Sequence, residues 1–180
     1  MPIRHLATLI ATLIAASLLI LGTARAGGAH EHGVARLDVA VDAKRVSILL
    51  EMPLDNLLGF EHAPRTDAER EKLAAVLVKL RAAQTLFRID SAAGCTLSRV
   101  DLQSGVLKLG RAVAPQKEGH GDLEATIEFD CNNSARAGFI EVGLFEEFAS
   151  LQRIDLQVAT PKGQLKATMR RPASRVVLAR

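Results

Sequence analysis

The sequence predicts an α+β fold: a single domain in which a mainly antiparallel sheet of hairpins carries one amphipathic helix on one face. Three observations lead to this prediction. Apolar and polar residues alternate in many short segments, which is typical of strands with one buried face. One segment, residues 67–83, has apolar residues at helical spacing instead. The chain shows no internal repeat and no domain linker, so these elements are expected to form one unit.

The first hairpin is predicted from two alternating segments. In residues 37–41 and 46–52 every second side chain is apolar, and polar residues 42–44 separate the two segments. Pro53 ends the second strand, because proline lacks the N–H that a sheet ladder needs. Residues 54–60 are mainly apolar and predict a short turn or a single helical turn.

The helix has a recognisable start. Thr66 and Glu69 form the T-x-x-E pattern of a capping box just after Pro64. Apolar side chains then recur at helical spacing and form one face that packs on the sheet. These residues are Leu73, Val76, Leu77 and Leu80.

The second half of the chain is predicted to be mostly strand. The alternation favours a half-buried strand that ends at Cys131, and Phe145 and Phe148 favour a short helix. The expected strands are 86–90, 96–109, 122–130, 139–142 and a final hairpin of 154–158 with 165–169; the expected helix is 144–151 and the expected loop 112–121.

Residues 1–26 are typical of a secretion signal. A basic start at Arg4 precedes an apolar run over residues 6–21, and Ala24-Arg25-Ala26 has the small-x-small pattern of a cleavage site. Cleavage after Ala26 leaves residues 27–180 as the mature domain. The run is short for a membrane span, so no stable membrane insertion is expected after cleavage. The alternative is cleavage after Ala29. The mature protein is predicted to be periplasmic.

Charge and composition argue against two functional classes. Removing Arg4 and Arg25 with the signal lowers the formal net charge from +3 to about +1, and no basic stripe, tryptophan or tyrosine suggests nucleic-acid binding. The sequence has no H-E-x-x-H, G-x-S-x-G, phosphate-loop or dinucleotide motif. It therefore predicts a protein that is not an enzyme.

The chain contains two cysteines, Cys95 and Cys131. In an oxidising compartment a lone pair most simply forms a disulfide, here closing a loop of about 35 residues. The alternative is a thiolate metal pair, which the absence of C-x-x-C spacing disfavours.

Two histidines stand close to the predicted mature N-terminus, in Ala29-His30-Glu31-His32-Gly33. Imidazole is a common ligand for zinc and also suits copper and nickel. Structural zinc normally takes four protein ligands and catalytic zinc three, so other parts of the chain have to supply more.

The mature chain resembles the ZrgA-type zinc-uptake proteins. The resemblance is carried by the segment Pro53-Leu54-Asp55-Asn56-Leu57-Leu58-Gly59-Phe60-Glu61-His62-Ala63-Pro64-Arg65-Thr66, by the early His-Glu-His-Gly, by Gly94-Cys95, by the strand ending in Cys131, and by 144–152 with 158–161. It implies a periplasmic zinc-binding accessory protein that holds Zn²⁺ through histidines and passes it to a transporter, such as a zinc ABC transporter. Members carry a long His/Asp/Glu tract before the second cysteine, whereas this chain has only residues 116–121 there.

Without that tract, the metal has to bind to the few remaining ligands. We predict about one Zn²⁺ held by His30 and His32, with His62 as the third ligand. If His30 is the mature N-terminus, its amine and ring together would favour Cu²⁺. The alternative function is a periplasmic interaction module with no metal role. The full set of candidate ligands is His30, His32, His62, His120, Glu31 and Glu61.

Overall fold

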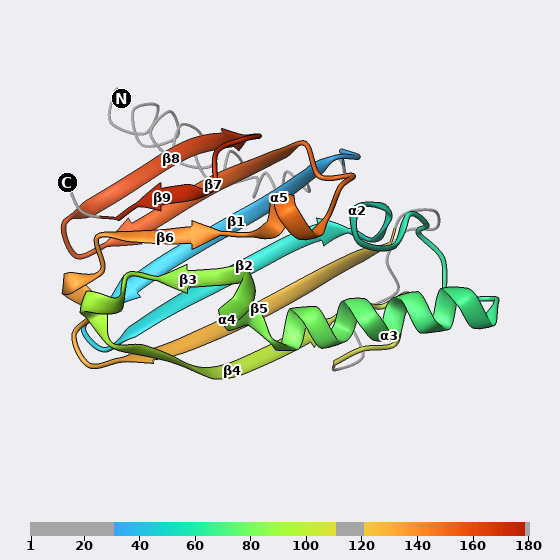
Figure 1. The fold of residues 1–180 in the computed structure, drawn as a ribbon, viewed down its shortest axis with the longest axis horizontal. Helices are drawn as coiled ribbons and strands as arrows, with labels where there is room; N and C mark the ends of the chain where they lie inside the picture. The colour runs from blue at the N-terminus through green and yellow to red at the C-terminus, as the bar shows by residue number, and fades with distance from the viewer. Residues whose placement is uncertain (1–30, 111–120, 179–180) are drawn as a thin grey trace, which may run out of the picture.

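The computed structural model describes residues 31–110 and 121–178. Within them the chain forms nine strands and four α-helices (Figure 1). The strands are β1 (Val34–Asp42), β2 (Arg45–Pro53), β3 (Phe87–Ile89), β4 (Cys95–Gln103), β5 (Asp122–Cys131), β6 (Phe139–Val142), β7 (Arg153–Thr160), β8 (Gly163–Arg170) and β9 (Arg175–Val177). The helices are α2 (Leu54–Leu58), α3 (Asp67–Arg81), α4 (Ala83–Leu86) and α5 (Leu144–Glu147), with 3₁₀ turns at η2 (Ser91–Ala93) and η3 (Ser134–Arg136).

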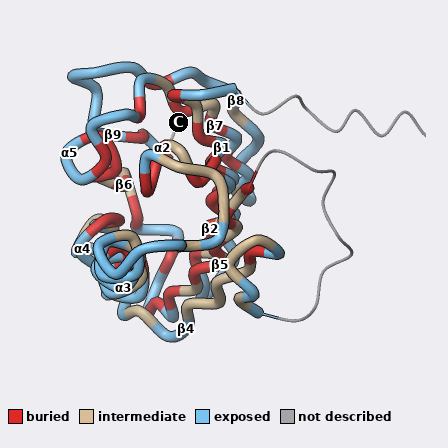
Figure 2. The backbone as a smooth tube through the Cα atoms, turned by 90° about the vertical axis from the view of Figure 1, so that its right-hand side faces the viewer, coloured by how far each residue is buried: buried red, intermediate tan, exposed pale blue. Residues whose placement is uncertain are grey.

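The strands form two sheets. Six strands lie in the order β4-β5-β2-β1-β7-β8, and the three short strands lie in the order β3-β6-β9. The small sheet and helices α3, α4 and α5 all lie on the same side of the six-stranded sheet (Figures 1 and 2). The buried residues line the space between these two layers, so the core is the inner face of the large sheet (Figure 2).

The alternation seen in the sequence produces this core. Ile48 of β2 stands opposite Val39 of β1 on one side and opposite Ile127 of β5 on the other. These three side chains are no more than 3% exposed. Successive side chains of a strand point to opposite faces, so the same register buries one apolar face along the whole sheet. Each fully buried side chain of this size stabilises the fold by about 1.5–3 kcal/mol.

The long helix α3 begins as predicted. The Thr66 hydroxyl accepts a hydrogen bond from the Glu69 N–H at 3.2 Å, and the Glu69 carboxylate accepts one from the Thr66 N–H at 3.2 Å. This reciprocal pair is a capping box, which satisfies N–H groups that the first helical turn leaves open. Val76 and Leu80 are buried against the core.

The fold prediction is confirmed in part. The large sheet is mainly antiparallel, as predicted, but it is mixed, because β1 pairs in parallel with β7. Strands β3, β6 and β9 form a separate sheet, and β9 was not predicted. The amphipathic helix is joined by three helices of four or five residues: α2 and α5 lie within the short segments expected at 54–60 and 144–151, and α4, which is too short to show a period, was not predicted. A parallel pair needs a long crossover, and local alternation does not reveal which distant strands meet.

Some elements match the prediction, and others begin or end at residues that differ from it. The helical turn predicted over 54–60 is confirmed as α2, and the final hairpin is confirmed as β7 and β8. The strand predicted over 96–109 ends at Gln103, because the chain turns back through a bridge between Ser104 and Leu109. Most of the loop predicted over 112–121 lies outside the described residues.

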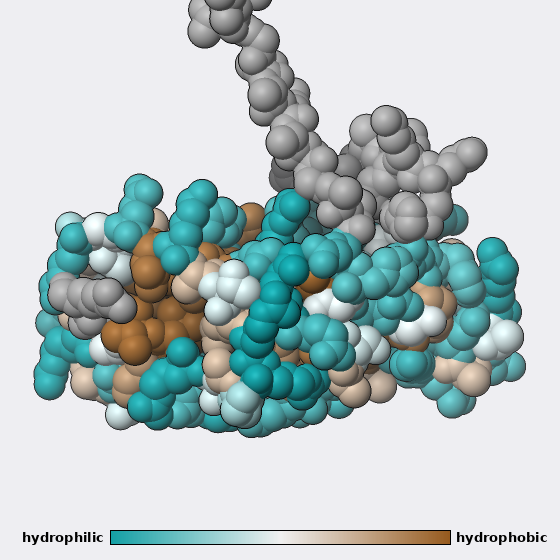
Figure 3. All heavy atoms as spheres, turned by 90° about the horizontal axis from the view of Figure 1, so that it is seen from above, coloured by the Kyte–Doolittle hydropathy of each residue, from teal (hydrophilic) through white to brown (hydrophobic). Residues whose placement is uncertain are grey.

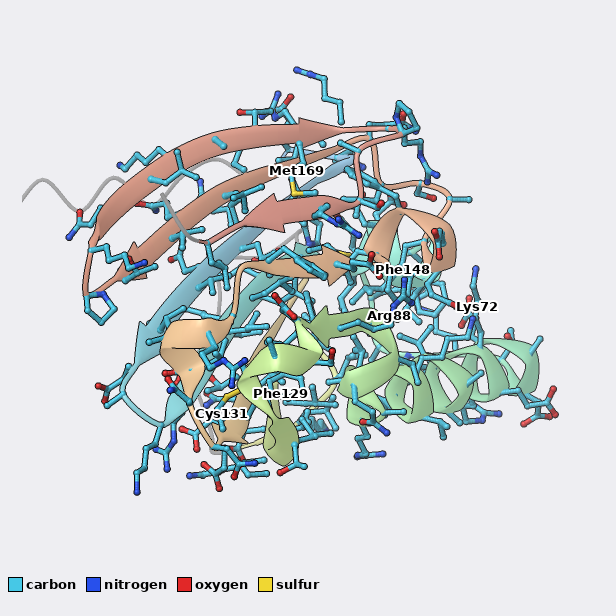
Figure 4. The ribbon with its side chains drawn as sticks, turned by 60° about the vertical axis from the view of Figure 1, so that its left-hand side comes forward. Lys72, Arg88, Phe129, Cys131, Phe148 and Met169 are labelled. Atoms are coloured by element: carbon cyan, nitrogen blue, oxygen red, sulfur yellow. A yellow bond between two sulfur atoms is a disulfide. The ribbon has the colours of Figure 1, made fainter. Side chains whose placement is uncertain are left out.

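The predicted disulfide is confirmed. Cys95 of β4 and Cys131 of β5 stand directly opposite each other and are bonded. The sulfur of Cys131 is visible at the end of the sheet in Figure 4. The Cys131 N–H donates to the carbonyl of Lys44, in the turn between β1 and β2. The disulfide therefore stabilises the end of the large sheet at which β1 ends.

The surface over β8 and β9 is mostly hydrophilic, with one apolar area near the C-terminal end (Figure 3). Val177 of β9 is 52% exposed. Among the described residues, no helix is both long enough and apolar enough to cross a membrane.

Candidate metal site

The turn before β1 is fixed at the opposite end of the large sheet from the disulfide. The Val34 N–H donates to the Glu31 carbonyl at 3.1 Å, which closes the turn around His32. The Gly33 carbonyl accepts from the N–H groups of Gln152 and Arg153 at 2.7 and 2.9 Å. These bonds join the turn to the start of β7, so His32 is held at a defined place.

The His32 ring lies between two carboxylates. Its Nδ1 is 3.0 Å from Asp55 Oδ2, and its Nε2 is 3.5 Å from Glu61 Oε1. The side chain of His32 is 59% exposed, whereas that of Glu61 is 15% exposed. The cluster therefore has a half-buried acidic side and an exposed imidazole side.

Helix α2 and the segment after it supply both acids. Asp55 lies in the first turn of α2, and the helix ends at Gly59, which has a left-handed φ of 74°. This conformation is easy for glycine and turns the chain sharply toward Glu61. The backbone of Glu61 packs against Gly121, where an added Cβ would lie 2.7 Å from the Glu61 carbonyl oxygen. The Gly121 carbonyl also accepts from the Leu54 N–H at 2.7 Å.

Glu31 is bound to a different partner. Its carboxylate pairs with the guanidinium of Arg153 through distances of 2.7 and 3.4 Å. This hydrogen bonding, together with the charge of Asp155, raises the pKa of Arg153 above its ordinary value. The structure therefore places Glu31 in an ion pair that fixes the turn to β7.

The structure directs His62 toward the helix cap. Its Nδ1 donates to the Ala63 carbonyl at 2.9 Å, its Nε2 is 4.0 Å from Glu69 Oε1, and its ring stacks on Phe60 at 4.9 Å between centroids. Hydrogen bonding from the Arg65 N–H, and then from Thr66 and the charge of His62, lowers the pKa of Glu69. His62 thus braces the loop before α3, and its ring nitrogens do not face the partners of His32.

Two predicted ligands, His30 and His120, lie outside the described residues. In the sequence each is close to a residue at this site: His30 is two residues before His32, and His120 directly precedes Gly121.

Comparison with protein families decides the identity. Residues 29–178 match the family model of the ZrgA family zinc uptake protein, which is most of the chain. The chain belongs to the ZrgA family. No curated protein matches it in sequence. The ZrgA match confirms the family that the central segment suggested and links the protein to zinc uptake, a description that names no catalytic activity.

The described part of this ZrgA chain does not by itself form a finished metal centre. No group of three or more His, Cys, Asp or Glu side chains within residues 31–110 and 121–178 is arranged to hold a metal ion. The geometry gives the reason: Asp55 and Glu61 contact different nitrogens of the His32 ring, so the ring separates them. One ion cannot take its ligands from both sides of an imidazole at once.

Sequence reasoning missed Asp55 as a partner of His32. The available signal was the polar pair Asp55-Asn56 inside the otherwise apolar residues 54–60. Asn56 is 3% exposed, which is unusual for an amide and points to fixed hydrogen bonds.

Proposed function

We propose that this protein binds Zn²⁺ at the end of the sheet where β1 and β7 begin, and that it assists zinc acquisition in the periplasm. The observation that supports this most directly is the pairing of His32 with Asp55 and Glu61. Imidazole nitrogen and carboxylate oxygen are both good zinc ligands. The family match over residues 29–178 supports zinc as the metal.

The proposed ligand set combines His32 with Asp55 or Glu61 and with His30 and His120. The set expected from the sequence contained His62, but this set does not, because the ring nitrogens of His62 are directed toward Ala63 and Glu69. For zinc to bind, the His32 ring has to leave one of its carboxylates and offer that nitrogen to the ion. His30 is included because it stands two residues before His32 in the sequence, and His120 because it directly precedes Gly121, which packs against Glu61. Their imidazoles would bring the count to the four that zinc prefers.

Exposure of the histidine side suits a protein that releases its metal. With His32 59% exposed, an ion bound there would remain accessible to a second set of ligands. We propose that the receiving protein is a zinc transporter of the inner membrane, and that residues 1–26 direct export.

The second candidate function is a periplasmic interaction module without a metal role. One observation favours it: both ring nitrogens of His32 already face carboxylates, so the turn is stabilised without any ion.

Calorimetric titration of untagged residues 27–180 separates the two functions. We expect about one Zn²⁺ per chain at neutral pH, with weaker binding of Ni²⁺. Affinity should fall as the pH is lowered, because protons compete with zinc for imidazole and carboxylate. Heat of binding that is absent at every pH tested would leave the interaction module as the better description.

Processing gives a second prediction. Intact-mass measurement of the exported protein should show Gly27 as its first residue, because Ala24 and Ala26 supply the small side chains that signal cleavage needs. A chain that begins at His30 would favour Cu²⁺, since the terminal amine and the ring would then chelate together. Repeating the titration with Cu²⁺ on that form would test this alternative.

A further inference from the structure

We infer that Asn56 is a positioning residue for the zinc site, because its side-chain amide clamps the turn that carries His32. The inference rests on the proposed function, and it adds a residue that contacts neither the metal nor its ligand side chains.

The amide of Asn56 binds the backbone on both sides of one peptide unit. Its Oδ1 accepts from the Gly33 N–H at 2.7 Å, and its Nδ2 donates to the Val34 carbonyl at 2.9 Å. Asn56 is 3% exposed, so these bonds do not exchange readily with water. An asparagine amide has the same donor and acceptor as a peptide group, and here it takes the place of a neighbouring strand.

The turn is held from its other side by β7. The Gly33 carbonyl receives the N–H groups of Gln152 and Arg153. Gly33 itself has a left-handed φ of 78°, and an added Cβ would lie 3.1 Å from the Gln152 side chain. A glycine fits both requirements. With α2 on one side and β7 on the other, residue 32 has little freedom to shift.

The clamp also sets the spacing within the cluster. Asn56 and Asp55 are neighbours in the same helical turn, and Asp55 Oδ2 is 3.0 Å from His32 Nδ1. Asn56, which binds the backbone at Gly33, therefore lies in the same rigid helical turn as Asp55, which contacts the imidazole of His32. Without the clamp, the ring and the carboxylate would be on independently moving segments.

The first test compares zinc affinity in two variants that each lose one buried hydrogen-bonding side chain. Asn56→Ala removes the clamp. Ser134→Ala is the matched control, because Ser134 is 1% exposed and its hydroxyl donates to the Asp42 carbonyl at the far end of β1. In folded protein we expect Asn56→Ala to weaken zinc binding by about 10- to 100-fold, as loss of an orienting group does. Ser134→Ala should stay within about twofold of wild type, because it is distant from the site.

The second test needs no metal. In wild type, Asp55→Asn should shift the NMR signals of the His32 ring, since the two side chains are in contact. In an Asn56→Ala background, the same change should shift them much less, because the ring is no longer held beside Asp55. If Asn56→Ala does not fold, Asn56→Ser, which supplies one hydroxyl in place of the amide, replaces it in both tests.

The outcomes separate the two ideas. Unchanged zinc affinity in folded Asn56→Ala, or an equal His32 shift with and without Asn56, overturns the positioning role while the zinc function stands. A wild type that binds no zinc overturns the proposed function, and the NMR comparison then decides alone whether Asn56 positions His32.

Discussion

Replacing His32 with alanine is expected to weaken zinc binding on the order of 100-fold, which is about the contribution of one ligand among four. His32 is the only described histidine whose ring nitrogens face two acidic side chains, Asp55 and Glu61. Its loss leaves the carboxylates without the imidazole that zinc prefers. Titration calorimetry of the untagged mature chain at neutral pH measures the change.

His62→Ala is the control for this prediction. Its ring contacts Phe60, Ala63 and Glu69 and not the partners of His32, so we expect its zinc affinity to stay close to wild type. The combined variant Asp55→Asn/Glu61→Gln keeps the size of both acids and should weaken binding as His32→Ala does. Zinc binding that His62→Ala weakens as strongly as His32→Ala does would restore the ligand set expected from the sequence.

Removing the disulfide should have the largest effect on stability. The double variant Cys95→Ser/Cys131→Ser is expected to lower the free energy of unfolding by about 2–5 kcal/mol, mainly because the unfolded chain becomes less restricted. The bond joins residues 36 positions apart and ties the edge strand β4 to β5. Denaturant unfolding followed by circular dichroism gives the free energy directly.

The same variant tests the separation of the two ends of the sheet. The disulfide lies beside the turn between β1 and β2, whereas His32 precedes the other end of β1 (Figures 1 and 4). Zinc affinity of the folded double variant should therefore match wild type. A fall in affinity that parallels the loss of stability would mean that the cysteines support the metal site. Wild-type protein with two reactive thiols after unfolding without reductant would contradict the bond itself.

Sequence patterns predicted the structural elements that depend mainly on residues close together in the sequence. The alternation of Val46, Ile48 and Leu50 predicted a strand, and all three are buried in β2. The T-x-x-E spacing of Thr66 and Glu69 predicted the start of α3, because a capping box involves residues only three apart. The paired cysteines predicted a bond that the register of β4 and β5 allows.

Patterns of this kind could not assign strands to sheets. The alternation in residues 154–158 predicts a strand but not that Leu156 stands beside Leu37 of β1 in parallel. Phe139–Val142 has the same alternation, yet it belongs to the small sheet between β3 and β9. Pairing depends on which apolar faces close the core together, and that is decided across the whole chain.

The candidate site likewise depends partly on residue types visible in the sequence and partly on contacts made only in the folded chain. The sequence by itself determined the residue types: an early histidine pair, an acidic segment after Pro53, two cysteines and a family match over most of the chain. Only the tertiary structure decided which of them meet. In the folded chain, Asp55 and Glu61 lie beside His32. Glu31 instead forms an ion pair with Arg153, and His62 lies beside Glu69 at the start of α3. The physical reason is that the turn at Gly33 is positioned by Asn56 and by the start of β7, which are 23 and about 120 residues away, and contacts over such separations leave no periodic trace in a sequence.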